Sequence, residues 1–518
     1  MAIIRSRYPD IPIREISITD LVFQGIDPGA EILIDGPTGR SLTGAQFMAE
    51  VRALAGGLAA RGIGPGSVVA LMAPNCPEFC VVFHAVALAG GCVTTVNPTY
   101  TAPELHHQLI DAGAGWLITV APFLPTARAG VAGTGVAQIA LLGPSHDGLP
   151  GLADLMGPPL PAQVPVPPDH VVCLPYSSGT TGLPKGVMLT QRNLSVNADQ
   201  SLALARVTRG ERTVAFLPFF HIYGLQVLMN IYLAAGGALV TMPRFDLEQF
   251  LTLCQQHRTK RLWIVPPVAL ALAKHPMVER FDLSSVEQIN SAAAPLGADV
   301  AQAMAERLGT SATQGYGMTE LSPVSHVTPP GLGRKGASGL TIPNTETRIV
   351  DPATLQDMPE GQDGEIWVRG PQVMKGYLNN PAATAATITA EGWLRTGDIG
   401  HVDGDGYLFI TDRLKELIKV KGFQVAPAEL EALLLAHPAI ADVAVIGVPD
   451  LEAGEVPVAF VTGAAPPTLE HVQAFLAPQV AAYKQVRALH VIEAIPKSAS
   501  GKILRRVLRD RLRAGHGA

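Results

Sequence analysis

Residues 176–187 read Tyr-Ser-Ser-Gly-Thr-Thr-Gly-Leu-Pro-Lys-Gly-Val. The glycines let the backbone approach a ligand closely, the hydroxyl and amide groups supply hydrogen-bond donors, and Lys185 adds a positive charge. This combination predicts a loop that cradles a polyphosphate. It differs from the P-loop of nucleotide hydrolases, in which Ser or Thr follows the lysine and holds magnesium, because Gly186 follows Lys185 here. We therefore expect ATP to be held in a different way.

The composition excludes several classes of protein. A chain of 518 residues is too long for one ordinary core, so we expect two or more domains. The 38 basic and 44 acidic residues give a formal net charge of -6, which argues against a nucleic-acid binder with a basic surface. The 5 cysteines form neither a disulfide framework nor a zinc pattern. This cysteine usage favours a reducing compartment, and we expect a cytoplasmic protein.

Two features argue against export and membrane insertion. The first residues, Met-Ala-Ile-Ile-Arg-Ser-Arg, lack the long apolar core and the cleavage site of a signal peptide. Residues 79–96 contain no Asp, Glu, Lys or Arg, but Ala89-Gly90-Gly91 divides them into a predicted helix and a predicted strand. We therefore expect a buried α/β core here and no membrane span.

The region before residue 320 alternates predicted strands with predicted helices, which indicates a parallel sheet covered on both faces. Ligands of such sheets sit at the carboxyl ends of the strands. Four loops are available there, at residues 176–187, 218–224, 292–295 and 314–320. The expected strands cover residues 31–35, 67–73, 92–97, 116–120, 170–175, 187–190, 213–217, 261–265 and 288–291, and the expected helices cover residues 43–61, 77–90, 101–112 and 224–235.

The pattern changes twice in the second half of the chain. From about residue 345 short strands and turns predict a small β subdomain, about 345–412, with residues 396–398 in a turn. After Asp412 a separate unit is expected, with helices at 427–436 and 469–476, strands at 442–448, 456–461 and 488–492, and a basic helix from residue 503. The predicted fold class is α/β, with a large N-terminal domain of layered α/β subdomains at 1–412 and a small α+β C-terminal domain at 413–518.

Three polar residues outside the phosphate loop suggest chemistry only when they are taken together. His221 beside aromatic residues is more often structural, Asp398 after Gly is typical of turns, and Lys502 after a Ser/Gly loop is usually a solvated charge. Their order and spacing behind the phosphate loop favour a shared function.

On these residues the chain resembles the adenylate-forming superfamily of acyl-CoA synthetases, luciferases and peptide-synthetase adenylation domains, over nearly its whole length. The motifs stand in the order of that family, at residues 176–187, 314–320, 396–398, 412–424 and 496–502. Residues 218–224, 315–324, 413–431 and 493–502 are similar to 4-coumarate:CoA and cinnamate:CoA ligases. The resemblance implies ATP, Mg²⁺ and coenzyme A as cosubstrates and cofactor, a small-molecule carboxylic acid as substrate, and a mobile C-terminal domain that rotates between two half-reactions.

The same resemblance implies roles for individual residues. Lys502 would bridge the carboxylate and the α-phosphate, where charge develops between two anions. His221 would form an aromatic gate near the carboxylate, Lys419 and Gln424 would serve catalysis, Lys415 would be the hinge, and Lys421 and Gly422 would face the CoA channel. The ATP and AMP contacts would come from Ser177, Ser178, Gly179, Thr180, Thr181, Gly182, Lys185, Ala293, Ala294, Gln314, Gly315, Tyr316, Thr319, Asp398 and Arg413, with Glu320 on the magnesium ion.

The acid pocket implied by the resemblance is a mostly apolar slot for a flat ring. It would be lined by Tyr223, Val227, Ala292, Ala293, Gly317, Pro323 and Val324, although each of these residues could equally serve ordinary core packing. The sequence departs from many plant members at Asn290, where lysine is common, and at Ala292, where glycine is common. Because the added methyl group takes space near the far end of the ring, we expect cinnamate to be preferred to 4-coumarate.

Other functions remain open at this point. A medium-chain fatty or other aryl acyl-CoA synthetase would share every nucleotide motif. An adenylation domain that loads a carrier protein, a luciferase, and a non-catalytic nucleotide-binding sensor are further alternatives. The presence of Lys185, Glu320, Asp398 and Lys502 argues against the sensor. The sequence leaves open whether the protein is a monomer or a homodimer.

Overall fold

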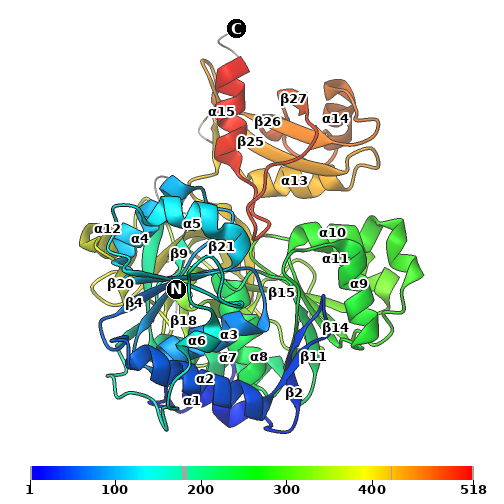
Figure 1. Cartoon of the computed structure of the whole chain (residues 1–518). Helices are drawn as coiled ribbons and strands as arrows, with labels where there is room; N and C mark the ends of the chain where they lie inside the picture. Colours follow the sequence, from blue (N-terminus) through cyan, green and yellow to red (C-terminus); the bar gives the residue numbers. More distant parts are fainter. Residues whose placement is uncertain (1–2, 178–183, 422, 516–518) are drawn as a thin grey trace.

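The computed structural model describes residues 3–177, 184–421 and 423–515. It has a mixed α/β fold with a large N-terminal part and a small C-terminal part (Figure 1), which confirms the fold class predicted from the sequence. Six residues with predicted roles lie outside the described residues: Ser178, Gly179, Thr180, Thr181, Gly182 and Gly422.

One sheet of the large part carries the strands of the phosphate loop at one edge. Its strand order is β20-β10-β8-β5-β4-β6-β7, and β9 pairs with β10. The strands β8, β5, β4, β6 and β7 run parallel, as the alternating pattern predicts. β9 and β10 flank the loop and pair antiparallel, so both ends of the loop are held. The bounds are β4 Val68–Met72, β5 Cys92–Thr95, β6 Trp116–Thr119, β7 Gln138–Leu141, β8 Val171–Cys173, β9 Tyr176–Ser177, β10 Lys185–Thr190 and β20 Gly376–Tyr377.

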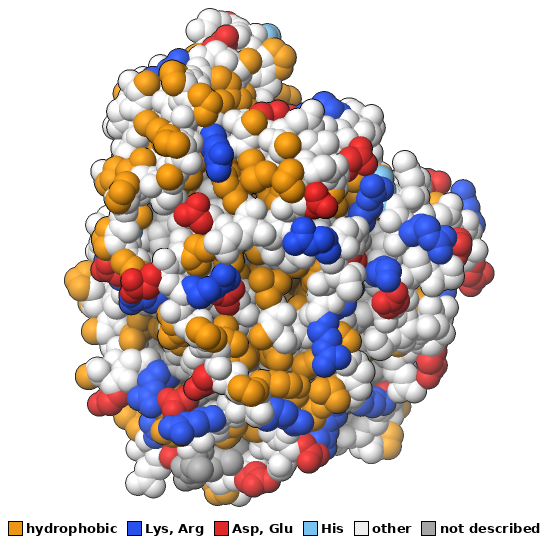
Figure 2. Space-filling view, turned by 90° about the horizontal axis from the view of Figure 1, so that it is seen from below, with side chains coloured by type: hydrophobic (Ala, Val, Ile, Leu, Met, Phe, Trp, Pro, Cys, Tyr) orange, Lys and Arg blue, Asp and Glu red, His pale blue; other side chains and the backbone are white. Residues whose placement is uncertain are grey.

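The apolar run of residues 79–96 lies inside this part of the molecule. It forms most of the helix α3 (Pro77–Leu88), in which every residue except Glu78 is buried, and then the buried strand β5. No helix within the described ranges is long and apolar enough to cross a bilayer. Figure 2 shows that acidic and basic side chains are interspersed over the face seen from below.

A smaller sheet lies beside the first and has the order β11-β12-β2-β3. The helix α2 (Gly44–Ala59) leaves β3 through the predicted capping box, in which Thr43 Oγ1 accepts from the Gln46 amide at 3.2 Å and Gln46 Oε1 accepts from the Thr43 amide at 2.8 Å. The strands are β2 Glu31–Asp35, β3 Ser41–Thr43, β11 Arg212–Ala215 and β12 Ala238–Thr241, and the other helices of the large part include α1 Ile18–Gly25, α4 Ala102–Ala112, α7 Gln191–Ala205, α9 Leu247–Gln256, α10 Pro266–Lys274 and α11 Ala298–Leu308.

The helix predicted at residues 224–235 is present, but most of it is a π-helix, Tyr223–Ile231, followed by the short α8, Tyr232–Ala234. All of the π-helix is buried, including two polar residues. Gln226 Nε2 donates to the Leu194 carbonyl at 2.7 Å, and Asn230 Nδ2 donates to Gln226 Oε1 at 2.8 Å. The spacing of apolar residues predicts a helix but not the register of its hydrogen bonds. Wider π turns are common at functional sites.

A third sheet joins the α/β region to the β-rich region in the order β1-β18-β19-β21-β22-β17-β16-β15-β14-β13. β13, β14 and β15 are parallel, and the strands that follow are antiparallel. The switch from parallel to antiparallel pairing therefore lies between β15 and β16, before the change of sequence pattern near residue 345, and the strands on both sides of residue 345 belong to one continuous sheet. The bounds are β1 Ile4–Arg5, β13 Arg261–Ile264, β14 Gln288–Ser291, β15 Ser311–Gly317, β16 Val324–Val327, β17 Gly339–Thr341, β18 Glu346–Val350, β19 Gly364–Arg369, β21 Leu394–Val402 and β22 Tyr407–Arg413.

Two segments predicted as turn or loop are strands in the structure. Residues 396–398 lie inside β21, where Asp398 pairs with Arg413 of β22. Gly397 has φ +71°, a value that glycine accommodates easily, so its presence suggested a turn although the strand continues through it. Residues 314–317 form the end of β15 because Gln314 pairs with β14 and residues 315–317 pair antiparallel with β16, the next strand in the chain.

After β22 the chain forms the small C-terminal part, which stands above the large part in Figure 1. Its sheet has the order β24-β23-β26-β25, with β27 paired to β26, and it has a hydrophobic core of its own. Among the described residues, hydrogen bonds that join it to the large part include those from the Leu414 amide to the Gly397 carbonyl at 2.8 Å, from the Ala428 amide to Asp412 Oδ2 at 2.8 Å, and from Lys274 Nζ to the Leu435 carbonyl at 3.0 Å. The bounds are β23 Ile418–Val420, β24 Phe423–Val425, α13 Pro427–Leu435, β25 Asp442–Asp450, β26 Gly454–Thr462, α14 Leu469–Leu476, β27 Ala488–Val491 and α15 Arg505–Gly515.

Candidate active site

Lys502 lies on the loop between β27 and α15, which runs down to the large part in Figure 1. The turn is closed by the Gly501 amide, which donates to the Ser498 carbonyl at 2.8 Å. Gly501 has φ +80°, and a Cβ atom there would lie 3.3 Å from Val265 and Pro267, so glycine permits this close approach. The loop thus inserts the lysine beside the carboxyl end of β13.

The surroundings of Lys502 set the charge of its ammonium group. Burial and the nearby Arg413 lower its pKa to about 8, and the charges of Asp398 and Glu320 partly offset this. On the other side, burial and the charge of Lys502 lower the pKa of His221 to about 3, so this imidazole is neutral at physiological pH. The structure therefore brings together five residues that the sequence singles out in five separate motifs.

A hydrogen-bonded pair of strands presents Asp398. The Tyr316 hydroxyl donates to Asp398 Oδ2 at 2.6 Å, and Arg413 Nε lies 3.3 Å from Asp398 Oδ1. Asp398 is only 6% exposed, so these partners stabilise a carboxylate that would otherwise be costly to bury. Burial and the neighbouring Asp398 charge raise the pKa of Tyr316, which stays a donor. A carboxylate in this position can accept from two neighbouring hydroxyls, such as those of a ribose.

The predicted adenine contacts lie on β15 and on the loop after β14. Gln314 Oε1 accepts from the Leu296 amide at 2.9 Å and ties the two segments together. Ala293 has φ +75°, an unusual value for a residue other than glycine, and such backbone strain is common at binding sites. Ala294 follows it on the same loop, and Gly315 leaves room beside the His326 carbonyl, 3.4 Å from where its Cβ would lie.

Tyr377 links two residues of the predicted phosphate and metal site, and sequence reasoning missed it. Its hydroxyl donates to Glu320 Oε1 at 2.8 Å, while Lys185 Nζ lies 4.9 Å from the centre of its ring. Tyr377 pairs with Val187 across β20 and β10, a contact between segments far apart in sequence. No local motif marks it, so only the sheet pairing could have found it.

The donor set fits magnesium held mainly by a nucleotide. Within the described ranges no group of three or more His, Cys, Asp or Glu side chains could hold a metal ion. Mg²⁺ commonly takes one or two carboxylates and keeps water and substrate phosphates as its other ligands. Glu320, which is buried in the short 3₁₀ turn Thr319–Leu321, can supply one such carboxylate next to Thr319.

The predicted acid-pocket residues come from the π-helix, the loop after β14, and the β15–β16 connection. Tyr223 and Val227 are buried, and the burial raises the pKa of the Tyr223 hydroxyl. Gly317 packs so tightly that a Cβ atom would lie 1.9 Å from the Pro323 carbonyl oxygen. Ala292 and Val324 are half-buried. These residues provide shape rather than charge.

The predicted hinge and CoA residues lie apart from this cluster. Lys419 and Gln424 face each other across the β23–β24 hairpin, and both are exposed. Lys421 lies in the turn of the hairpin with φ +48°, and Lys415 lies in the turn after β22. Among the residues that the structure describes, Lys419 and Lys421 form backbone hydrogen bonds with Glu455 and Ala453 rather than with the Lys502 cluster.

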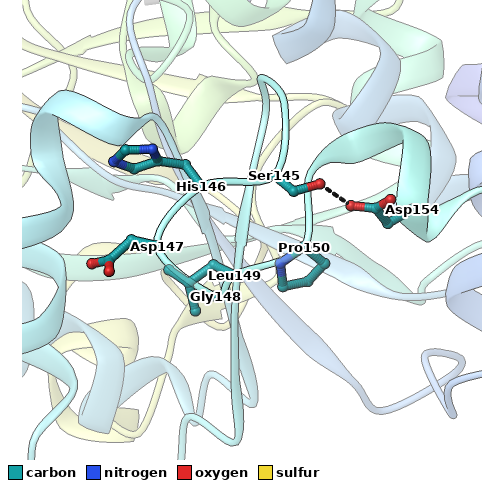
Figure 3. Close-up of a pocket in the computed structure, with 7 residues that line it drawn as sticks. All are labelled: Ser145, His146, Asp147, Gly148, Leu149, Pro150 and Asp154. Atoms are coloured by element: carbon teal, nitrogen blue, oxygen red, sulfur yellow. Dashed lines mark hydrogen bonds between the residues drawn. The ribbon is translucent and has the colours of Figure 1, made fainter.

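A separate hollow is formed by the loop around residues 145–150 (Figure 3). Ser145 Oγ donates to Asp154, whose carboxylate also accepts from the Gly151 amide at 2.9 Å. These bonds shape the turn itself. None of its lining residues belongs to the predicted site: Ser145, His146, Asp147, Gly148, Leu149, Pro150 and Asp154.

Comparison with known families agrees with this geometry. The family model described as AMP-binding enzyme matches residues 25–378, and the model described as AMP-binding enzyme C-terminal domain matches residues 429–502. The chain belongs to the AMP-binding enzyme family. This confirms the superfamily predicted from the sequence motifs.

Three similar proteins illustrate this membership of the AMP-binding enzyme family. A protein of Oryza sativa subsp. japonica named 4-coumarate–CoA ligase 3 is 42% identical over 531 residues, which cover 99% of this chain and 96% of the relative. The structure of the anthranilate CoA ligase AuaEII in complex with anthranoyl-AMP has a TM-score of 0.90 at 26% identity, covering 98% of this chain and 99% of that one. ATP-bound MatB from Rhodopseudomonas palustris has a TM-score of 0.88 at 30% identity, covering 96% and 98%. Apo MatB has a TM-score of 0.78, so the chain is more similar to the ATP-bound arrangement.

Proposed function

We propose that this AMP-binding enzyme is an ATP-dependent carboxylic acid:CoA ligase that works through an acyl-adenylate. The observation that carries the proposal is the cluster in which the Lys502 ammonium interacts with Asp398, Glu320, Arg413 and His221. A mobile cation inserted among groups suited to ribose, metal and phosphate is what the first half-reaction requires.

In that half-reaction a carboxylate oxygen of the acid attacks the α-phosphorus of ATP. The bond from this phosphorus to the bridging oxygen breaks, and pyrophosphate leaves with the bonding electrons. Lys502 bridges the two anionic reactants and stabilises the charge that develops between them. Lys185 and Thr319 bind phosphate oxygens together with the loop of residues 178–183, and Asp398 binds the ribose with help from Arg413.

The nucleotide base and the metal ion complete the ATP site. The base lies against Gln314, Gly315 and Tyr316, with Ala293 and Ala294 at its edge. Glu320 would hold a Mg²⁺ ion together with the phosphates of ATP, and the ion would neutralise phosphate charge. Tyr377 is well placed to orient Glu320, because its hydroxyl donates to that carboxylate.

In the second half-reaction the sulfur of CoA attacks the acyl carbon as the thiol loses its proton. The bond from this carbon to the phosphate oxygen breaks, and AMP leaves. We propose that a domain from about residue 413 rotates about Lys415 for this step, withdraws Lys502, and brings Lys421 and Gly422 toward the CoA channel. Lys419 and Gln424 then take part in catalysis.

We propose cinnamate or a hydroxycinnamate as the acid. The pocket residues are apolar and lie at the carboxyl ends of β14 and β15, which suits a flat aromatic ring, and relatives named 4-coumarate–CoA ligase align over nearly the full chain. We also propose a cytoplasmic location, because all 5 cysteines are free.

The experiment that tests the function is acid-dependent AMP release from ATP, Mg²⁺ and CoA. The panel contains cinnamate, 4-coumarate, caffeate, benzoate, octanoate and palmitate. We expect the strongest turnover with the cinnamates. Turnover with alkyl acids alone would contradict the pocket assignment and keep the mechanism. Tight ATP binding without turnover on any acid would contradict the ligase.

A further inference from the structure

The loop that carries His221 is held by a side chain from another sheet. This loop, residues 216–222, connects β11 to the π-helix. Asn75, in the loop between β4 and α3, is 3% exposed. Both the nitrogen and the oxygen of its side-chain amide form hydrogen bonds with the backbone of residues 215–219. Its Nδ2 donates to the carbonyls of Ala215 at 2.9 Å and Leu217 at 2.8 Å, and its Oδ1 accepts from the Phe219 amide at 2.8 Å.

A second side chain holds the same loop at Phe220, the residue before His221. Thr95, at the end of β5, donates through Oγ1 to the Phe220 carbonyl at 2.8 Å. β4 and β5 are parallel neighbours, so both holding residues come from the carboxyl ends of adjacent strands. The loop after β11 is thus hydrogen-bonded to residues at the carboxyl ends of β4 and β5 in the other sheet.

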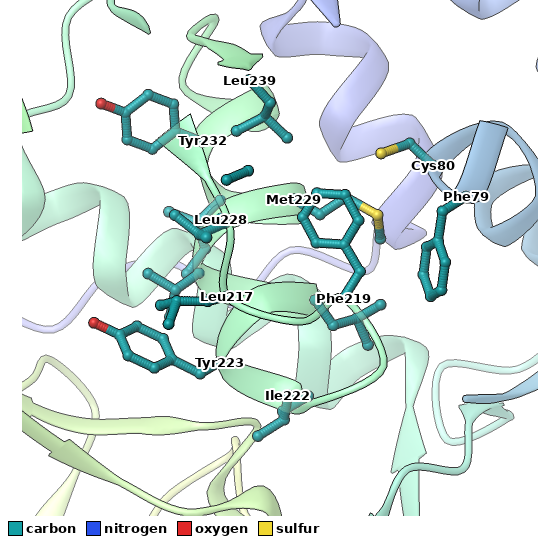
Figure 4. Close-up of a cluster of buried hydrophobic side chains, with 14 of the residues drawn as sticks. Phe79, Cys80, Leu217, Phe219, Ile222, Tyr223, Leu228, Met229, Tyr232 and Leu239 are labelled. Carbon is teal, nitrogen blue, oxygen red and sulfur yellow. The ribbon is translucent and has the colours of Figure 1, made fainter. Parts of the chain in front are cut away.

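Apolar packing leaves the loop little freedom. The Phe219 ring lies 5.6 Å from the Phe79 ring and belongs to the buried cluster with Met229 and Ile222 (Figure 4). At Gly224, where the π-helix begins, a Cβ atom would lie 2.2 Å from the Pro218 carbonyl oxygen, so the chain turns back tightly on itself. A shift of the Phe219 backbone therefore has to move the short turn that follows it.

His221 stands on that turn. Its amide donates to the Pro218 carbonyl at 3.0 Å, its carbonyl accepts from the Leu225 amide at 2.9 Å, and its Nδ1 accepts from the Tyr223 amide at 3.3 Å. These bonds fix the imidazole relative to the backbone of the loop, and the Asn75 bonds fix that backbone relative to the large sheet. The position of the imidazole next to Lys502 depends on both.

We infer that Asn75 is a positioning residue for the acid-binding step of the ligase. It acts through the loop of residues 216–222 and determines where His221 stands at the mouth of the acid pocket. The expected effect on acid kcat/KM rests on the proposed function. The claim that Asn75 fixes the loop of residues 216–222 rests on the hydrogen-bond geometry alone.

The inference predicts a selective kinetic defect. Asn75→Ala leaves two buried carbonyls and one amide without their partner, and Asn75→Asp keeps the shape but removes both donors. We expect each variant to lower kcat/KM for the acid about 10-fold, the scale of one to two lost hydrogen bonds, while KM for ATP changes less than about twofold. Asn75→Ser serves as a milder variant if the first two fold poorly.

Asn193 provides a matched control because its amide makes the same three kinds of bond elsewhere. Its Nδ2 donates to the carbonyls of Pro371 and Val373, both at 2.9 Å, and its Oδ1 accepts from the Thr190 amide at 3.0 Å. Asn193→Ala should cost similar stability without the selective loss of acid kcat/KM. An equal loss in both variants would overturn the inference, because the effect would then be general destabilisation.

A double-mutant cycle tests whether Asn75 acts through His221. The loss in Asn75→Ala with His221→Ala should not exceed that of His221→Ala alone. Fully additive losses would overturn the inference.

Hydrogen exchange in the intact chain gives a readout that needs no turnover. Asn75→Ala should accelerate exchange at the Phe219 and His221 amides, and Asn193→Ala should not. Unchanged exchange at both amides overturns the inference whether or not the enzyme is active. A wild-type protein that releases no AMP with any acid would instead contradict the proposed function, and the exchange result would stand.

Discussion

The nucleotide end and the acid end of the candidate site are built in different ways. At the nucleotide end, charged and hydroxyl groups hold one another, as in the pairs Tyr316–Asp398 at 2.6 Å and Tyr377–Glu320 at 2.8 Å. At the proposed acid end, the residues are mostly apolar and the backbone approaches closely, as at Gly317. The chemistry of ATP demands particular functional groups, whereas an acid pocket demands only a volume. Substitutions should therefore act through charge at one end and through shape at the other.

The largest effect is expected from removing the cation at the nucleotide end. Lys502→Ala should slow formation of the acyl-adenylate by roughly 100-fold or more, the scale of one lost electrostatic contact of about 3 kcal/mol. Thioester formation from a supplied acyl-adenylate should survive, since the proposed rotation withdraws Lys502 in that step. Stopped-flow measurement of each half-reaction checks this. Equal loss in both would contradict the rotation of the C-terminal domain.

The next largest effect is expected from overfilling the acid end. Gly317→Ala places a Cβ atom 1.9 Å from the Pro323 carbonyl oxygen, so the backbone at this part of the proposed acid pocket has to move. We expect kcat/KM for the acid to fall about 10- to 100-fold, as for overpacking of 1–3 kcal/mol, with a smaller change in KM for ATP. Gly143→Ala is the control, because no described atom lies within 4 Å of the Cβ position there. An equal rise in both KM values would break the proposed division of the site.

The pH dependence of kcat/KM should follow the ionisation of the Lys502 ammonium group. Because the pKa of Lys502 is lowered to about 8, its ammonium charge is present below that pH and is lost above it. The kcat/KM value reports the free enzyme, and we expect it to fall about fivefold between pH 8 and pH 9. In the complex, two bound anions raise the pKa of the lysine, so kcat should fall only at higher pH. A flat kcat/KM profile up to pH 10 would contradict the assignment.

A smaller effect is expected from weakening the support of Asp398. Tyr316→Phe removes the hydroxyl that donates to the carboxylate, and we expect KM for ATP to rise about fivefold, the scale of one hydrogen bond of about 1 kcal/mol. KM for the acid should change little. Tyr8→Phe is the control, because the buried Tyr8 hydroxyl has no hydrogen-bond partner among the described residues. A larger change in KM for the acid than in KM for ATP would contradict the assignment of Asp398 to the nucleotide end of the site.

The smallest effect is expected from a single methyl group at the acid end. Ala292→Gly should raise the ratio of kcat/KM for 4-coumarate to that for cinnamate about threefold. One methylene group in a closed pocket changes the ratio of kcat/KM values by roughly 10-fold or more. We expect a smaller effect here because Ala292 is only half-buried. Competition between the two acids in one reaction measures the ratio directly. A fall in the ratio would show that Ala292 does not limit the far end of the ring.

Much of the nucleotide end could be predicted from the sequence. The family and the α/β fold class were predicted correctly, because motifs such as the phosphate loop combine several polar residues at fixed spacing. Tyr377 was missed because its partners, Lys185 and Glu320, reach it only through strand pairing. The strand conformation of residues 396–398 was missed for the same reason, since Gly397 suggests a turn when its partner strand is unknown.

The sequence says less about the residues of the proposed acid pocket than about those of the nucleotide site. Ala292 and Val324 look like ordinary core residues, and their role depends on the space that the folded backbone leaves between them. The π register of the helix at Tyr223 also has no local signal. The roles of the pocket residues therefore stay predictions until the acid panel and the substitutions above have been measured.

The hydrogen bonds that join the C-terminal part to the large part have a consequence for the free energy of the proposed domain rotation. The bond from the Ala428 amide to Asp412 and the bond from Lys274 to the Leu435 carbonyl are each worth only about 1–3 kcal/mol. If the proposed rotation exchanges these bonds and the apolar contact of Leu417 and Ala426 with Ile399, the difference in ligand binding free energy between the two orientations decides which one is populated. ATP and acyl-AMP, rather than the protein alone, would act as the thermodynamic switch between the two halves of the reaction.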